Sequence, residues 1–262
     1  MRDMGHTPTS DERQVLDLFS FLTREATMLE RLDCPFWDTP TLRDGAGGSF
    51  LYGWPYLERG EQWPVCAHGV EMEMGMQVDG RDARHASAIP GLYVTYQCAA
   101  PVRARFEAIR AGRPCLPVVR YYPDPDRAAR APIPSPSDDI PESEFGTLLI
   151  ANGTLHMLPR MCVLELIAPE QWHALPELPL QAPWGQVVKA VTCDENGYYP
   201  GYDDHFGGWH ITNWDRQMLP PPCPDCDQMP QLVVQLEWGD GNRSLWACPE
   251  HPERAHYEKF HK

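Results

Sequence analysis

The chain contains 262 residues, of which 42% are hydrophobic, and its 22 basic and 37 acidic residues give a formal net charge of −15. This charge argues against a nucleic-acid-binding protein, which needs a basic patch to replace the counterions of the phosphate backbone. No segment approaches the roughly 18–20 apolar residues of a membrane-spanning helix, and the first residues lack the apolar stretch of a secretory signal. We therefore expect a cytoplasmic protein that has neither a membrane nor a nucleic acid as its partner.

The apolar spacing predicts one amphipathic helix over residues 10–31, followed by short strands. Strand-like runs lie at 50–52, 72–78, 92–98, 116–122, 148–150, 161–167, 187–191, 232–236 and 245–247. A short helix is expected over 101–111, where Gly112 ends it. Residues 123–144 contain six prolines among acidic and small residues, which predicts a loop in the middle of the chain.

Two segments, about 45–102 and about 205–262, share a set of features in the same order. The first contains Gly47-Gly48, Trp54, Cys66 with His68, Gln77 and Tyr96-Gln97-Cys98, and the second contains Gly207-Gly208, Trp214, Cys223 with Cys226, Gln235 and Trp246-Ala247-Cys248. We interpret residues 1–262 as a single domain with an internal duplication. Each glutamine either bonds the backbone at a strand bend or contacts a ligand.

The second segment carries a pattern of metal ligands. Cys223 and Cys226 form one C-x-x-C pair, and Cys248 and His251 form a C-x-x-H pair after 21 intervening residues. A hairpin between two such pairs brings them together as in a zinc ribbon, and a Cys₃His set closes a tetrahedral Zn²⁺ site. Because no position stays open for a substrate, we expect this zinc to be structural.

The first segment is expected to have lost its metal site. Val65 aligns with Cys223, and Pro101 aligns with His251, so Cys66 and Cys98 are expected to be small buried residues. The remaining cysteines, Cys34, Cys115, Cys162 and Cys193, are assigned no special role.

The order of these motifs resembles a known family. The glycine pair, the tryptophan, the C-P-x-C turn, the strand with its glutamine at 232–236, the Gly239-Asp240-Gly241 turn and the final W-x-C-P-x-H are similar to the YwqG-like domain of bacterial proteins. They are also similar to the related eukaryotic programmed cell death protein 2 family. The resemblance covers residues 45–102 and 205–262 best.

The resemblance implies an α+β, mostly β fold of two pseudo-symmetric repeated β units, here with a zinc-ribbon-like C-terminal hairpin and an N-terminal helix. It also implies a protein-binding role, since the eukaryotic relatives are linked to chaperoning a ribosomal protein and bacterial relatives stand among immunity proteins of toxin systems. It supplies no catalytic residues.

The charge distribution suggests where a partner would bind. Residues 1–131 have a net charge of −3 and residues 132–262 have a net charge of −12, although solubility alone can explain an acidic balance. Just before the second repeat lies a cluster of tyrosines and carboxylates, formed by Tyr198, Tyr199, Tyr202, Asp203 and Asp204. Tyrosines beside acidic groups suit a basic protein partner, either a toxin to be neutralised or a client to be chaperoned.

Two alternative interpretations of this cluster remain. The first is a hydrolase-type enzyme in which Asp203, Asp204 and His205, with nearby His210, act as general acid and base. The second is a solvated loop without a function of its own. A cleft with converging side chains would favour the enzyme, and a flat acidic surface would favour binding.

Overall fold

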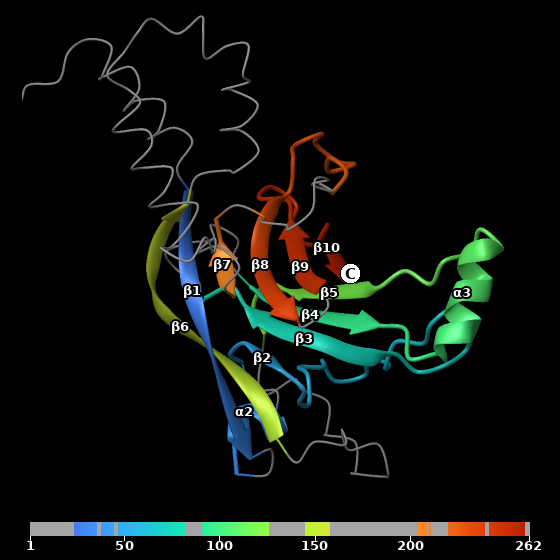
Figure 1. The fold of residues 1–262 in the computed structure, drawn as a ribbon, viewed down its shortest axis with the longest axis horizontal. Coiled ribbons are helices and arrows are strands. Elements are labelled where there is room, and N and C mark those ends of the chain that lie inside the picture. Colours follow the sequence, from blue (N-terminus) through green and yellow to red (C-terminus); the bar gives the residue numbers. More distant parts are fainter. Residues whose placement is uncertain are drawn as a thin grey trace, which may run out of the picture.

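The computed structural model describes residues 24–35, 38–44, 47–81, 91–125, 145–157, 204–208, 210, 220–238 and 241–259 (Figure 1). Some sequence expectations fall outside the described residues. They are the first part of the helix expected over 10–31, the strands expected at 161–167 and 187–191, most of the loop at 123–144, Trp214, Cys162, Cys193, and the four residues Tyr198, Tyr199, Tyr202 and Asp203.

The described residues form one antiparallel sheet of ten strands and two short helices (Figure 1). The strands are β1 (Arg24–Pro35), β2 (Phe50–Leu51), β3 (Glu73–Asp79), β4 (Leu92–Gln97), β5 (Val118–Tyr122), β6 (Phe145–Met157), β7 (His205–Gly207), β8 (Gln231–Trp238), β9 (Gly241–Ala247) and β10 (His256–Lys259). The helices are α2 (Pro40–Asp44) and α3 (Val102–Arg110). The sheet curves into a nearly closed barrel in which β10 comes back close to β5.

The strand order is arranged symmetrically about the two long strands β1 and β6. It runs β10-β9-β8-β7-β1-β6-β2-β3-β4-β5, so four strands extend outward in chain order from each long strand. The group that is later in the chain, β7–β10, joins the sheet through the pairing of β7 with the early strand β1. The earlier group, β2–β5, joins it through the pairing of β2 with the later strand β6. The mostly β fold expected from the sequence is confirmed in this part of the chain.

The helix predicted over 10–31 is wrong for residues 24–31, which belong to β1. This strand pairs with β6 along its length and also with β7. Leu29, whose spacing suggested a helix face, is buried on the strand together with Ala26. A register shift lies between Thr27 and Leu29. Pairing with residues more than 100 positions away overrides a local apolar period, which the sequence pattern cannot reveal.

The two hairpins β3–β4 and β8–β9 share their internal register. Each contains a register shift at the residue two positions before its glutamine, Gln77 or Gln235. Tyr96 and Trp246 each pair with the residue three positions before that glutamine. Matching bulges in matching places point to one structural plan, because bulges are specific features of a strand pair rather than accidents.

The glycine pairs do not share this correspondence. Phe50 lies opposite Gln77, and His205 lies opposite Gln235. Gly47-Gly48 precedes Phe50, whereas Gly207-Gly208 follows His205, so the two pairs fall on opposite sides of equivalent positions. The alignment of the glycine pairs in the sequence is therefore wrong.

Both halves contribute to the largest apolar core of the described residues. Its members include Met76, Val78 and Tyr93 from the first half and Phe206, Val233, Val234, Leu245 and Tyr257 from the second. A polar contact also joins the halves, since the buried guanidinium of Arg243 donates to the carbonyl oxygen of Gly75 at 3.2 Å. Burial of this shared apolar surface is the main stabilising term for the barrel.

Candidate metal centres

The four residues predicted as zinc ligands come together in the structure. Cys223 and Cys226 lie on the turn before β8, and Cys248 and His251 lie on the turn between β9 and β10. Their ligand atoms all lie within 4.8 Å of one another, and Cys223 and Cys248 are buried. The β8–β9 hairpin brings the two turns to the same end of the sheet, as the spacing predicts.

The distances in this C-terminal cluster agree with tetrahedral geometry. Nδ1 of His251 lies 3.7 Å from Sγ of Cys223 and 3.9 Å from Sγ of Cys248, and the Sγ atoms of Cys226 and Cys248 lie 3.5 Å apart. Tetrahedral angles with ordinary Zn–S and Zn–N bonds give about 3.6 Å between S and N and about 3.8 Å between two sulfurs. The four residues could therefore hold a metal ion with little adjustment.

The thiols of the C-terminal cluster differ in acidity. The backbone amide of Gln228 favours the Cys226 thiolate, but partial burial and the neighbouring thiols of Cys248 and Cys223 raise its pKa to about 11. Burial disfavours the Cys248 thiolate, but hydrogen bonds from the His251 backbone and from Cys226 outweigh this and lower its pKa. Without a metal the cluster keeps protons that a divalent cation would displace.

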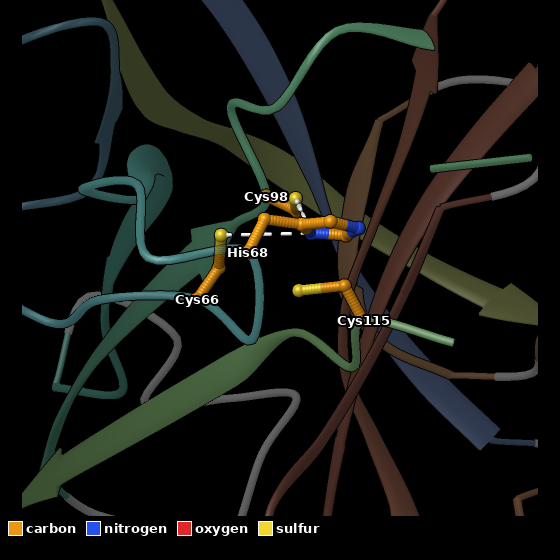
Figure 2. A group of neighbouring side chains, drawn as sticks. All are labelled: Cys66, His68, Cys98 and Cys115. Atoms are coloured by element: carbon orange, nitrogen blue, oxygen red, sulfur yellow. Dashed lines mark hydrogen bonds between the residues drawn. The ribbon is translucent and has the colours of Figure 1, made fainter. Parts of the chain in front are cut away.

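A second cluster with the same donor set lies in the first half of the protein. The side chains of Cys66, His68, Cys98 and Cys115 point toward one another, as Figure 2 shows. Their ligand atoms also lie within 4.8 Å of one another, with Cys66 and Cys98 buried. The expectation that this half had lost its ligand set is wrong, and Cys115, to which the sequence assigned no special role, is the fourth member of the set.

The distances in this N-terminal cluster resemble those of its counterpart. Nδ1 of His68 lies 3.4 Å from Sγ of Cys98 and 3.8 Å from Sγ of Cys66 (Figure 2). Both values are close to the roughly 3.6 Å between S and N in a tetrahedral zinc site. In both clusters the histidine presents Nδ1 to the thiols.

The acidity of the thiols is again unequal. Burial disfavours the Cys66 thiolate, but hydrogen bonds from the backbone of His68 and Val70 and from the side chains of His68 and Cys98 lower the pKa to about 6. Burial, followed by the neighbouring thiols of Cys115 and Cys66, raises the pKa of Cys98 to about 11, against the opposing effect of the Ala100 backbone. The Cys66 thiol is therefore more acidic than the Cys98 thiol.

The sequence contains a signal for this cluster that residue spacing alone obscures. C-x-H at 66–68 is one residue shorter than C-x-x-C at 223–226. The fourth donor, Cys115, is separated from Cys98 by a helix, whereas only two residues separate His251 from Cys248. Aligning His68 with Cys226 places both glutamines nine residues further on. A search that allowed this deletion and a helical insertion would have found the set.

Asp204 is buried, and its carboxylate is bonded to other parts of the fold. Its side chain is only 7% exposed, pairs with the Arg31 guanidinium, and accepts the backbone N–H of Glu237 at 2.8 Å. Arg31 Nη2 donates to Oδ1 of Asp204 at 2.7 Å and also to the backbone carbonyl oxygen of Glu237. These bonds fasten β1 to β8 and leave Asp204 little surface to offer a partner.

His205 and His210, the other described members of the enzyme hypothesis, are both buried. Burial, followed by the nearby His210, lowers the pKa of His205 to about 4. Burial also lowers the pKa of His210 to about 4, against the opposing charge of Glu258, and its Nε2 lies 2.9 Å from the Ser244 hydroxyl. Both rings are neutral at physiological pH.

Comparisons with known proteins leave the family of this chain open. No protein-family model matches the sequence, and no curated protein matches it. Within the part of the chain that the structure describes, no helix has the length and apolar character required to cross a bilayer.

Proposed function

We propose that this protein is a non-enzymatic protein-binding module that holds a basic protein against an acidic surface. An immunity-type protein that neutralises a toxin is the form we favour, and a chaperone-like binder of a basic client is the closest variant. In either form, the C-terminal cluster binds a structural Zn²⁺ that fixes the shape of the surface around it.

The donor set supports a structural zinc. Three thiolates and one imidazole fill the four positions of a tetrahedral ion, so no position is open for a substrate or an activated water. Cys223, Cys226, Cys248 and His251 would hold the ion, which would lock the turn before β8 against the turn after β9. The bound ion would act only as a cross-link between these two turns.

The charge of these two turns is the observation that carries the proposal. The two turns that carry the cluster also carry four exposed carboxylates, Asp225, Asp227, Glu250 and Glu253. Arg254 is the basic side chain on the same turns, and it pairs with Asp225. An acidic surface of this kind attracts a basic partner and increases its association rate. The exposed apolar side chain of Met229 lies on the adjoining segment and offers a contact that excludes water.

The resemblance to the YwqG-like domain and to the programmed cell death protein 2 family supports the same class of function. That family membership is part of the proposal. The described residues of the competing hydrolase hypothesis have other roles, since Asp204 is paired within the fold and the two histidines are buried and neutral.

Capture from the native host tests the proposal. The tagged full chain should retain a basic protein at low salt and release it at high salt, because exposed charges are screened within about 10 Å at 0.1 M. The triple variant Asp227→Asn, Glu250→Gln and Glu253→Gln should lose that protein. A matched triple variant with the same change in charge elsewhere, Glu25→Gln, Glu58→Gln and Glu71→Gln, should keep it.

The comparison between the two triple variants decides the result. Equal capture by both, or capture of no basic protein at low salt, contradicts the proposed surface. Zinc content of the first triple variant should equal that of the wild type, which separates a loss of charge from a loss of the metal.

A further inference from the structure

We propose that Cys66, His68, Cys98 and Cys115 bind a second Zn²⁺, and that this ion fastens both ends of the α3 segment to the sheet. This inference goes beyond the proposed partner binding and does not depend on it. It rests on four donors from three separate segments, on a turn that matches the C-terminal one, and on the way α3 is attached.

The turn that carries Cys66 and His68 has the hydrogen bonds of the C-terminal turn. The Cys66 N–H donates to the Val70 carbonyl at 2.8 Å, and the Gly69 N–H donates to the Cys66 carbonyl at 2.9 Å. In the C-terminal turn, the Cys223 N–H donates to the Gln228 carbonyl at 2.8 Å, and the Asp227 N–H donates to the Cys223 carbonyl at 2.8 Å. Each bond of the first turn spans one residue less.

The backbone after the second donor is also the same in both turns. Gly69, directly after His68, has φ of +74°, and Asp227, directly after Cys226, has φ of +58°. A non-glycine residue in this left-handed region is uncommon and indicates a turn that the surroundings hold in place. The first turn is therefore a one-residue-shorter version of the metal-binding turn, with His68 in place of Cys226.

The remaining two donors also have counterparts. Cys98 lies two residues after Tyr96, as Cys248 lies two residues after Trp246, and these aromatic residues share one register in their hairpins. Cys115 precedes β5 as His251 precedes β10. The first half differs by placing α3 between its third and fourth donors.

The attachment of α3 explains what an ion at this place would do. The helix has no buried residue, and its apolar side chains Val102, Phe106 and Ile109 are 56%, 59% and 56% exposed. Figure 1 shows α3 at the outer edge of the molecule, connected to β4 on one side and β5 on the other. Cys98 and Cys115 flank the helix, so a shared ion closes this loop at its base.

Packing alone offers little to hold such a segment. Isolated helices of fewer than about 12 residues are marginal in water, and helical stability in proteins comes mainly from an apolar face packed against other elements. α3 has nine residues, and Arg103 and Glu107 form an exposed i,i+4 pair that contributes little. The ion would supply the constraint that packing does not.

Metal content and proteolysis test the inference on the full chain, reconstituted with Zn²⁺ under reducing conditions. We expect two zinc ions per wild-type chain, one in Cys115→Ser, and two in the control Cys34→Ser, whose half-buried thiol belongs to neither cluster. Trypsin should cut after Arg103, Arg105 and Arg110 on the order of tenfold faster in Cys115→Ser than in the wild type, since local opening sets cleavage.

The readouts separate this site from the C-terminal one. Cys223→Ser should also retain one zinc, but its α3 segment should stay protected. If Cys115→Ser does not fold, chelation of Cys223→Ser, which should hold only the N-terminal ion, gives the same proteolysis test, with protection restored by added Zn²⁺. A wild-type chain that holds one zinc, or a disulfide among Cys66, Cys98 and Cys115 under these conditions, would overturn the inference.

Discussion

The Sγ atom of Cys98 lies 3.4 Å from Nδ1 of His68, although 30 positions separate the two residues in the chain. His68 sits on a turn before β3, and Cys98 follows the end of β4, so the β3–β4 hairpin creates the contact. The β8–β9 hairpin does the same for Cys223 and His251. In each half of the barrel, a β-hairpin thus brings a thiol and an imidazole together.

Replacing Gln77 with leucine should destabilise the protein. Gln77 is fully buried, its Oε1 accepts the Tyr56 N–H at 2.7 Å, and its Nε2 donates to the Gly48 carbonyl at 3.2 Å. These contacts confirm backbone bonding for this glutamine. Leaving the buried N–H unpaired costs about 1–3 kcal/mol, which urea unfolding measures.

Gln97 provides the control for that substitution. It is a strand glutamine whose 3.4 Å bond to Glu73 is exposed, so Gln97→Leu should change the free energy of unfolding by less than about 0.5 kcal/mol. Equal costs at the two positions would show that the Gln77 hydrogen bonds contribute nothing measurable.

Two glycines of β6 should differ in their tolerance of a methyl group. A Cβ at Gly146 would lie 2.3 Å from the backbone oxygen of Tyr52 and 2.8 Å from Leu42, whereas a Cβ at Gly153 meets nothing within 4 Å. Gly153→Ala should cost only about 1 kcal/mol, because φ there is +92°. Gly146→Ala should cost about 3 kcal/mol or more, since backbone must move. Thermal unfolding of both variants checks the order, and a smaller loss for Gly146→Ala contradicts it.

Acid should destabilise the barrel through its buried histidines. The pKa of His205 and of His210 is about 4 in the folded protein, mainly because of burial, and 6.5 is the ordinary value. Above pH 6.5 both states are neutral and the histidines contribute nothing. As pH falls from about 6.5 to about 4, the unfolded chain takes up protons first, so stability falls by up to about 3 kcal/mol per histidine.

A pair of substitutions isolates this effect. Urea midpoints at pH 7 and pH 4.5 should differ less for the double variant His205→Gln, His210→Gln than for the wild type. An unchanged difference would mean that other groups, including metal ligands that acid protonates, account for the acid sensitivity.

Removing the Asp204 carboxylate should weaken the link between β1 and β8. Asp204→Ala leaves the Arg31 guanidinium and the Glu237 N–H without this acceptor, at a cost of about 2 kcal/mol after allowance for the partial exposure of Arg31. Glu107→Gln, which breaks the exposed pair with Arg103, should cost less than about 0.5 kcal/mol. Chemical denaturation measures the free energy of unfolding of both variants. Similar losses of stability would show that the Asp204 bonds contribute nothing measurable to the fold.

Much of the fold could be predicted because its signals are local. Short apolar runs gave the strands at 72–78, 92–98 and 116–122 to within about two residues, and Gly112 marked the end of the helix that became α3. The error at residues 24–31 arose because β1 is stabilised by β6 and β7, which lie far away in the chain. The order of the strands depends on such distant pairings and has no local signature.

The candidate sites were predictable to different degrees for a similar reason. Cys223, Cys226, Cys248 and His251 stand in two short motifs of standard spacing, and the structure brings them together. The N-terminal cluster departs from that spacing twice, by one deleted residue in its turn and by a helix before Cys115. The turn hydrogen bonds and the positive φ of Gly69 reveal the equivalence, and both are properties of the folded chain.

Native mass spectrometry of the zinc-reconstituted full chain tests the central claim, that each half of the barrel holds one structural zinc. The wild type should carry two zinc ions, Cys115→Ser and Cys223→Ser should each carry one, and the double variant should carry none. A folded wild-type chain with no zinc would contradict the account as a whole. A wild-type chain with a single zinc that Cys223→Ser abolishes and Cys115→Ser leaves in place would contradict it for the first half.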